Sequence, residues 1–141
     1  MPTPAQAQAI ERYCNEVWGQ GNLDAIDDIF ASDYIRHGPA LEGGTTDGAK
    51  GLKDLVGLYR TAAPDLAVPL QTIVGEGDTV LTRWAATGTN SGEFAGQAPT
   101  GKAFEIFGFW MHRFENGKIV EEWATWDTQD FLAQIGQTLP G

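Results

Sequence analysis

The hydrophobic pattern of this chain changes its period once, at Pro64, and this change constrains the fold more than any other feature. Before it, apolar residues recur every three to four positions in three stretches, which begin after Thr3, Asn22 and Asp47. This spacing is typical of helices with one buried face. After Pro64 the period is that of strands separated by turns. Helices followed by strands predict an α+β domain, with helices covering one face of a curved antiparallel sheet.

Four strands are expected in the second half of the chain, over residues 66–74, 80–89, 103–114 and 119–126. Asn116-Gly117 lies between the last two and is a strong signal for a β-hairpin. A short helix should follow from Asp127 and end at Gly136. Residues 34–42 show no clear period and are interpreted as irregular. A length of 141 residues fits one domain, residues 1–141.

The expected strand 103–114 is apolar on both faces. Its even positions include Phe104 and Trp110, and its odd positions are Phe107, Phe109 and Met111. A strand with one face in water should alternate polar and apolar residues. Because the helices can cover only one face, we expect the other to pack on a second copy of the chain, as a homodimer. Coverage by a loop of the same chain is the alternative.

The charge balance limits the possible partners. The chain has 19 acidic against nine basic residues and a net charge of −10. Binding of nucleic acid or of an anionic membrane needs a basic surface, so neither partner is expected. One cysteine, Cys14, and no signal-peptide pattern in the first 20 residues favour the cytoplasm.

Acid–base chemistry is the reaction type that the residues favour. His37, His112 and Cys14 do not lie at the spacing of a metal site, so we expect no metal. An ionisable group in an apolar pocket can have its pKa adjusted for proton transfer. Asp127, beside Trp126, could be such a group, or it could be only a helix cap.

The register of the hairpin decides which groups meet. A two-residue turn would place His112 opposite Glu121, and Trp110 opposite Trp123. A three-residue turn with a bulge would place Trp110 opposite Glu122, with the same glutamate diagonal to His112. In both registers His112 has a glutamate within reach on the neighbouring strand.

Several short motifs together resemble the SnoaL-like polyketide cyclases of the nuclear transport factor 2-like superfamily. The motifs run over nearly the whole length and include Trp18-Gly19-Gln20-Gly21-Asn22-Leu23-Asp24, Asp33-Tyr34-Ile35-Arg36-His37, Gly92-Glu93-Phe94-Ala95-Gly96 and Asn116-Gly117-Lys118-Ile119-Val120-Glu121-Glu122-Trp123. The resemblance implies a cone-shaped curved antiparallel sheet packed on three N-terminal helices, with one deep pocket. It also implies ring closure by intramolecular aldol condensation, without a cofactor.

The residues and the resemblance together predict a set of site residues. The candidate acid–base residues are His37, Glu122 and Asp127. The candidate substrate-binding residues are Trp18, Tyr34, Leu55, Tyr59, Trp110, His112 and Trp126. The chain departs from the family pattern at three positions. The aspartate that acts in the polyketide cyclases corresponds to Ala124, a pocket histidine corresponds to Trp110, and Asn90 stands where many broader relatives have the histidine of Gly-Thr-His.

The function expected from these observations is that of a cofactor-independent acid–base enzyme acting on a small activated carbonyl or polyketide-like compound, as a cyclase, isomerase or lyase. One alternative is a non-catalytic domain that binds a small molecule on the same fold. Another is an epoxide hydrolase of the same superfamily, whose chemistry resembles an Asp-Arg-Asp arrangement. That arrangement has no clear counterpart around Arg83 or Arg113.

Overall fold

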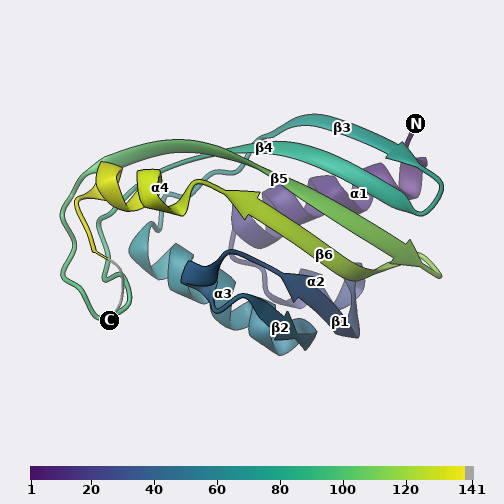
Figure 1. The fold of residues 1–141 in the computed structure, drawn as a ribbon, viewed down its shortest axis with the longest axis horizontal. Coiled ribbons are helices and arrows are strands. Elements are labelled where there is room, and N and C mark those ends of the chain that lie inside the picture. Colours follow the sequence, from purple (N-terminus) through teal and green to yellow (C-terminus); the bar gives the residue numbers. More distant parts are fainter. Residues whose placement is uncertain (139–141) are drawn as a thin grey trace.

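The computed structural model describes residues 1–138. Its helical segments are α1 (Pro4–Arg12), which continues as a π-helical turn η1 (Tyr13–Trp18), α2 (Asp24–Ile29), the 3₁₀ turn η2 (Ala40–Glu42), α3 (Gly48–Ala62) and α4 (Thr128–Ile135). Its strands are β1 (Phe30–His37), β2 (Thr45–Asp47), β3 (Leu70–Glu76), β4 (Thr79–Thr89), β5 (Ala103–Glu115) and β6 (Lys118–Trp126). The order along the chain can be followed in Figure 1.

The expected helix starts are confirmed in part. Thr3 caps α1 through a reciprocal pair of hydrogen bonds with Gln6. Asp127 caps α4, and Gly136 ends it in the left-handed conformation that glycine adopts without strain. The second helix starts at Asp24 and the third at Gly48, and neither has a side-chain cap, so Asn22 and Asp47 precede these helices without capping them.

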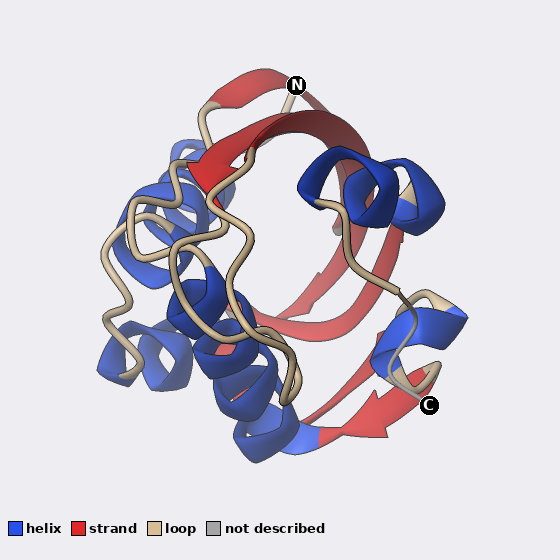
Figure 2. Ribbon diagram, turned by 90° about the vertical axis from the view of Figure 1, so that its left-hand side faces the viewer, coloured by secondary structure: helices blue, strands red, loops and turns tan. Residues whose placement is uncertain are grey.

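The six strands form one curved sheet in the order β2-β1-β6-β5-β4-β3. The strands arch around the helices that pack on their inner face, as the end-on view of Figure 2 shows. This arrangement confirms the expected α+β class. The sheet is mixed, however, because β1 pairs with β6 in parallel while the other neighbours are antiparallel.

Strand β1 corrects the expectation that the chain is irregular from residue 34, since it is regular up to His37, and β2 is a further strand that was not expected. Polar Ser32 and Asp33 interrupt the apolar alternation of β1, and its pairing with β6 shifts register between Phe30 and Ile35. A regular two-residue period is therefore absent from the sequence. The strand is ordered by pairing on both sides, with β2 and with β6.

The hairpin of β5 and β6 adopts neither expected register. It begins as a two-residue turn, with Glu115 opposite Lys118 and Phe114 opposite Ile119. Val120 is then an extra residue on β6, since the next pair is Arg113 with Glu121. A bulge of this kind shifts the pairing that follows by one residue. His112 consequently lies opposite Glu122, and Trp110 lies opposite Ala124.

The outer face of the sheet carries exposed apolar side chains. Phe107 is 54% exposed, Phe109 43% and Leu81 45%, on the adjacent strands β4 and β5. The inner face of β5 is covered, with Phe104, Trp110 and other even positions buried. The two faces of β5 therefore differ in their surroundings although both are apolar in sequence.

Candidate functional site

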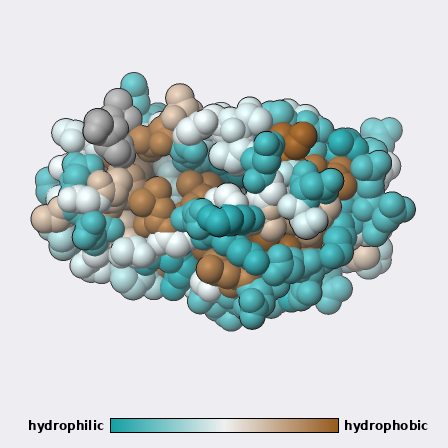
Figure 3. Space-filling view, turned by 90° about the horizontal axis from the view of Figure 1, so that it is seen from below, coloured by the Kyte–Doolittle hydropathy of each residue, from teal (hydrophilic) through white to brown (hydrophobic). Residues whose placement is uncertain are grey.

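A cavity of about 60 Å³ lies between the inner face of the sheet and the helices. It is lined by Trp18, Arg36, Glu42, Tyr59, Ala62, Ala63, Leu66, Val68, Trp84, Ala86, Asn90, Phe104, Ile106, Trp110, Trp126, Phe131 and Ile135. Seen from below, hydrophobic residues gather around a hollow toward the α4 end of the molecule (Figure 3). The cavity is therefore a mostly apolar recess.

Indole rings form much of the cavity wall. The ring centroids of Trp84 and Trp110 are 5.4 Å apart, and those of Trp84 and Trp126 are 6.3 Å apart. Gly108 on β5 makes this approach possible, because a Cβ there would collide with the Trp84 ring and lie 2.7 Å from Cβ of Trp126. The wall offers a flat aromatic surface suited to an unsaturated or aromatic ligand.

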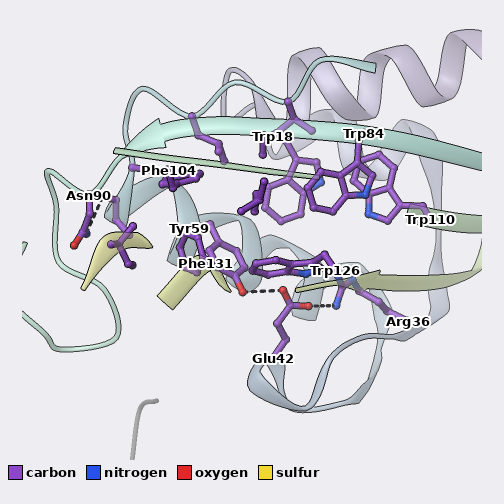
Figure 4. Close-up of a pocket in the computed structure, with 17 residues that line it drawn as sticks. Trp18, Arg36, Glu42, Tyr59, Trp84, Asn90, Phe104, Trp110, Trp126 and Phe131 are labelled. Atoms are coloured by element: carbon purple, nitrogen blue, oxygen red, sulfur yellow. Dashed lines mark hydrogen bonds and ion pairs between the residues drawn. The ribbon is translucent and has the colours of Figure 1, made fainter. Parts of the chain in front are cut away.

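A small charged group interrupts this apolar wall. The Tyr59 hydroxyl donates to Oε2 of Glu42 at 2.8 Å, and Nη1 of Arg36 donates to Oε1 of Glu42 at 2.8 Å. The Glu42 carboxylate therefore lies between the tyrosine and the guanidinium (Figure 4). The side chain of Glu42 is only 2% exposed and that of Arg36 only 4%.

Three elements position this group. Arg36 lies on the inner face of β1, and Tyr59 lies near the end of α3. Glu42 lies in the turn η2, which Gly43 ends with a φ of 89°. A positive φ is adopted readily by glycine, so the chain can turn back into β2 at this point. The turn carries the carboxylate over the end of the cavity that contains Arg36.

Burial and charge shift the pKa values of these side chains. Burial raises the pKa of Tyr59 well above its ordinary range, and the neighbouring charge of Glu42 raises it further. The phenol is therefore a hydrogen-bond donor at neutral pH. Burial lowers the pKa of Arg36, but the charges of Glu122 and Glu42 outweigh that effect and the net pKa is raised.

A buried acid and a histidine lie behind Arg36. Nε of Arg36 donates to Oε1 of Glu122 at 3.0 Å, and Nε2 of His112 lies 2.7 Å from Oε2 of Glu122. Both Glu122 and His112 are completely buried. Burial would raise the pKa of Glu122, but the hydrogen bond and charge of His112 and the charge of Arg36 lower it below its ordinary value.

Four of the expected substrate-binding residues line the cavity, namely Trp18, Tyr59, Trp110 and Trp126. Tyr34 and His112 are buried in the core, and Leu55 packs at its edge, so these three do not line it. Glu122 is also absent from the wall. Asp127 accepts from the backbone N–H of Asp130 at 2.9 Å and so caps α4, which is the structural role considered for it above.

His37 lies on the outer face of the sheet, so the expectation that it lines the cavity is wrong. Its ring stacks on Trp123 with centroids 5.2 Å apart, and its Nε2 lies 2.7 Å from Oε2 of Glu121. The reason is the alternation of β1, since Arg36 points inward and the next residue must point outward.

Sequence reasoning missed Arg36, Glu42, Trp84 and Asn90. The signal for Arg36 was present in the Tyr34–His37 motif, but it becomes visible only when this motif is interpreted as a strand. Asn90 is buried and accepts from the Thr100 backbone N–H at 3.1 Å while donating to the Gly92 carbonyl at 2.9 Å. These hydrogen bonds stabilise the loop of residues 90–100 beside the cavity.

Residues 1–138 contain neither a candidate metal cluster nor a candidate membrane-spanning helix. Within residues 1–138, no three His, Cys, Asp or Glu side chains come together in a group that could hold a metal ion. No helix in the same part of the chain has the length and apolar character needed to cross a membrane.

Comparison with known proteins identifies the family. The sequence model of the SnoaL-like polyketide cyclases matches residues 8–135. The chain belongs to this family. No match was found among curated proteins.

Solved structures support the same conclusion. IdmH from Streptomyces antibioticus, a proposed polyketide cyclase, is 32% identical, with 95% of this chain and 99% of IdmH covered and a TM-score of 0.82. A proposed SnoaL-like polyketide cyclase from Jannaschia sp. CCS1 is 18% identical, with 98% of each chain covered and a TM-score of 0.85, which shows the fold. AclR from Streptomyces galilaeus, a proposed hydroxylase, is 27% identical, with 95% of this chain and 83% of AclR covered and a TM-score of 0.78.

Proposed function

We propose that this SnoaL-like protein is a cofactor-independent acid–base enzyme acting on a small activated carbonyl or polyketide-like compound. The observation that carries the proposal is the position of Glu42. Among the described residues that line the cavity, Glu42 is the one carboxylic acid, and it faces a wall of aromatic rings. A carboxylate at an apolar cavity can take a proton from an activated carbon.

Arg36 and Tyr59 complete the proposed chemistry. When Glu42 removes a proton next to a carbonyl group, negative charge develops on the carbonyl oxygen. The guanidinium of Arg36 lines the same cavity and can stabilise that charge. The Tyr59 hydroxyl holds the second oxygen of Glu42 in place. The enolate would then attack a second carbonyl in a cyclase, or be reprotonated at another position in an isomerase.

Glu42 takes the place of the acids expected from the sequence. Ala124 cannot transfer a proton, Glu122 does not line the cavity, and Asp127 is occupied as a helix cap. Glu42 reaches the cavity from the loop between two strands. The acid–base group would thus lie in the turn between β1 and β2 and not on the last strand of the chain.

The test is exchange of a substrate proton with solvent deuterium. A panel of β-ketoesters and aryl ketones is incubated with the protein in D₂O, and loss of the signal of the hydrogen next to the carbonyl is followed by ¹H NMR. We expect exchange above the buffer rate, and a loss of about 100-fold or more in Glu42→Gln, since general base catalysis contributes about 10²–10⁴. The matched control is Asp127→Asn, which removes a carboxylate but retains a helix cap. Equal rates in Glu42→Gln and wild type would refute the assignment.

Epoxide hydrolysis is a second candidate, favoured by one observation. Arg36 bridges two carboxylates, Glu42 and Glu122, in an acid–Arg–acid arrangement formed by residues distant in sequence. Against it, only Glu42 of these two acids reaches the cavity. Incubation with small epoxides in H₂¹⁸O distinguishes the reactions, because only a hydrolase would place ¹⁸O in a diol product. A binding domain without activity would bind the ketones yet catalyse neither reaction.

We also propose that the protein forms a homodimer through the outer face of the sheet. Phe107, Phe109 and Leu81 form an exposed apolar surface there, and Arg83 lies over the Phe107 ring at 4.7 Å. Light scattering at micromolar concentration should give the mass of a dimer, and Phe109→Lys should give a monomer. A wild-type protein that is monomeric at these concentrations would contradict the proposal.

A further inference from the structure

Three ionisable side chains form one row across three neighbouring strands. Arg36 on β1 lies directly opposite Glu122 on β6, and Glu122 lies directly opposite His112 on β5. All three point to the inner face, and all three are buried. The row ends at the cavity, since Arg36 contributes to its wall and the other two do not.

Glu122 does not contact a molecule bound in the cavity directly. Arg36 occupies its Oε1 and His112 lies at its Oε2, at 3.0 and 2.7 Å. Its side chain is completely buried and does not reach the cavity. A role in the reaction must therefore be exerted through a neighbour, and Arg36 is the neighbour that reaches the cavity.

The contact with Glu122 fixes the orientation of the whole guanidinium. Arg36 donates from Nε to Glu122 and from Nη1 to Glu42. Because the guanidinium is planar and rigid, two fixed donors determine the direction of the third nitrogen. Among the described residues no side chain or backbone group accepts a hydrogen bond from Nη2 of Arg36. Nη2 is not one of the fully buried atoms that lack a partner, so it keeps some accessible surface.

Without Glu122 the same arginine has a competing geometry. Arginine and a carboxylate pair most strongly as a fork, through two parallel N–H···O bonds. An Arg36 released from Glu122 could form that fork with Glu42 alone. Both Glu42 oxygens would then accept from the guanidinium, with Oε2 still bonded to Tyr59 as well, and Nη2 would no longer be available, so the acid–base group would be a weaker base.

We propose that Glu122 is a positioning residue that holds Arg36 turned away from a fork with Glu42, and so reserves Nη2 for an oxygen atom of the bound molecule. His112 holds the second oxygen of Glu122 in place, so it also helps to position Arg36. The inference rests on the proposed acid–base function of Glu42, but the orientation of Arg36 can be measured without any activity.

The first measurement is NMR of ¹⁵N-labelled arginine in the wild-type protein. An arginine fixed through two donors should give separate, slowly averaging Hη signals, and Arg36→Lys identifies them by their loss. We expect fixed signals for Arg36 in the wild type and averaged or shifted signals in Glu122→Gln. Glutamine keeps the shape of Glu122 but has no charge. Freely rotating Hη groups in the wild type would overturn the proposal, whether or not the variant folds.

The second measurement is the pH dependence of deuterium exchange with the β-ketoester panel. Glu122→Gln should lower the rate about 10-fold or more at pH 7 and move the acid limb of the profile to lower pH, because Arg36 would pair more tightly with Glu42. The control Glu121→Gln changes the adjacent glutamate on the outer face and should leave the NMR signals and the profile unchanged. A Glu122→Gln variant with altered Arg36 signals but the wild-type profile would overturn the positioning role. If the wild type shows no exchange, the proposed function fails while the NMR result still decides the orientation of Arg36.

Discussion

The two faces of the sheet carry the same three kinds of charged residue in opposite environments. On the inner face Glu122 contacts Arg36 and His112, and on the outer face Glu121 contacts His37 and Arg113. We call these sets the inner trio (Arg36, Glu122 and His112) and the outer trio (His37, Glu121 and Arg113). Each residue of one trio is the sequence neighbour of a residue of the other. Burial is the property that separates them.

The comparison teaches that position relative to the sheet decides what a charged residue can do. The inner trio is cut off from solvent, so its charges interact strongly and each needs a partner. The outer trio is partly exposed, with 34% of the His37 side chain and 38% of the Arg113 side chain accessible. Water and salt screen such charges, and exposed ion pairs contribute little to stability.

One extra residue on β6 determines which glutamate joins which trio. With a regular two-residue hairpin, Glu121 would have been opposite His112 and would have pointed inward. Val120 is an extra residue that shifts the pairing of β6 by one, so Glu122 points inward instead. The sequence Glu121-Glu122 alone gives no preference between these outcomes.

The largest expected effect is the loss of stability when the inner glutamate is removed. Glu122→Leu would leave Arg36 without its Nε acceptor and His112 without its partner. Breaking a buried ion pair in this way costs about 3–5 kcal/mol, measured as the free energy of unfolding in urea. The matched variant Glu121→Leu on the outer face should lower the urea midpoint much less. Equal losses in the two variants would show that burial does not separate the trios.

The second expected effect is a difference in acid sensitivity. The pKa of Glu122 is below its ordinary value of 4.5 in the folded protein. Its ionised form therefore stabilises the fold above about pH 4.5, and this contribution is lost as the pH falls through the folded pKa.

Glu122→Gln lacks this contribution at every pH. The difference between wild type and Glu122→Gln in the free energy of unfolding should thus stay constant from about pH 7 to 5 and shrink below about 4.5. Urea titrations at several pH values measure it. A difference that keeps its size down to pH 3 would mean that Glu122 is not ionised in the folded protein.

The fold could be predicted from the sequence further than the site could. The helical and strand halves, the Asn116-Gly117 turn and the Asp127 cap follow from local patterns, which one stretch of chain contains by itself. Strand β1 could not be predicted, because its order comes from pairing with β2 and β6 and not from its own alternation. The charged part of the site could not be predicted for the same reason, since Arg36 belongs to β1 and Glu42 to the turn that follows it.

The aromatic part of the site was accessible to prediction for the opposite reason. Trp18 and Tyr59 belong to apolar stripes with helical spacing, and the resemblance to the family placed Trp110 and Trp126 at the pocket. The charged part depends on a bulge and an irregular strand. Both are set by contacts between distant segments, which a single sequence does not reveal.

The smallest expected effect concerns salt and the outer trio. The pKa of Glu121 is lowered mainly by its hydrogen bond with His37, with a further contribution from Arg113. Since the outer trio is partly exposed, raising the salt to about 1 M, where the screening length is about 3 Å, should remove most of the difference in stability between wild type and Glu121→Gln. The difference between wild type and Glu122→Gln should persist in the same salt, because ions do not reach the buried trio. Urea titrations with and without NaCl compare the four cases, and a salt response of equal size on both faces would contradict the division into a buried and a screened trio.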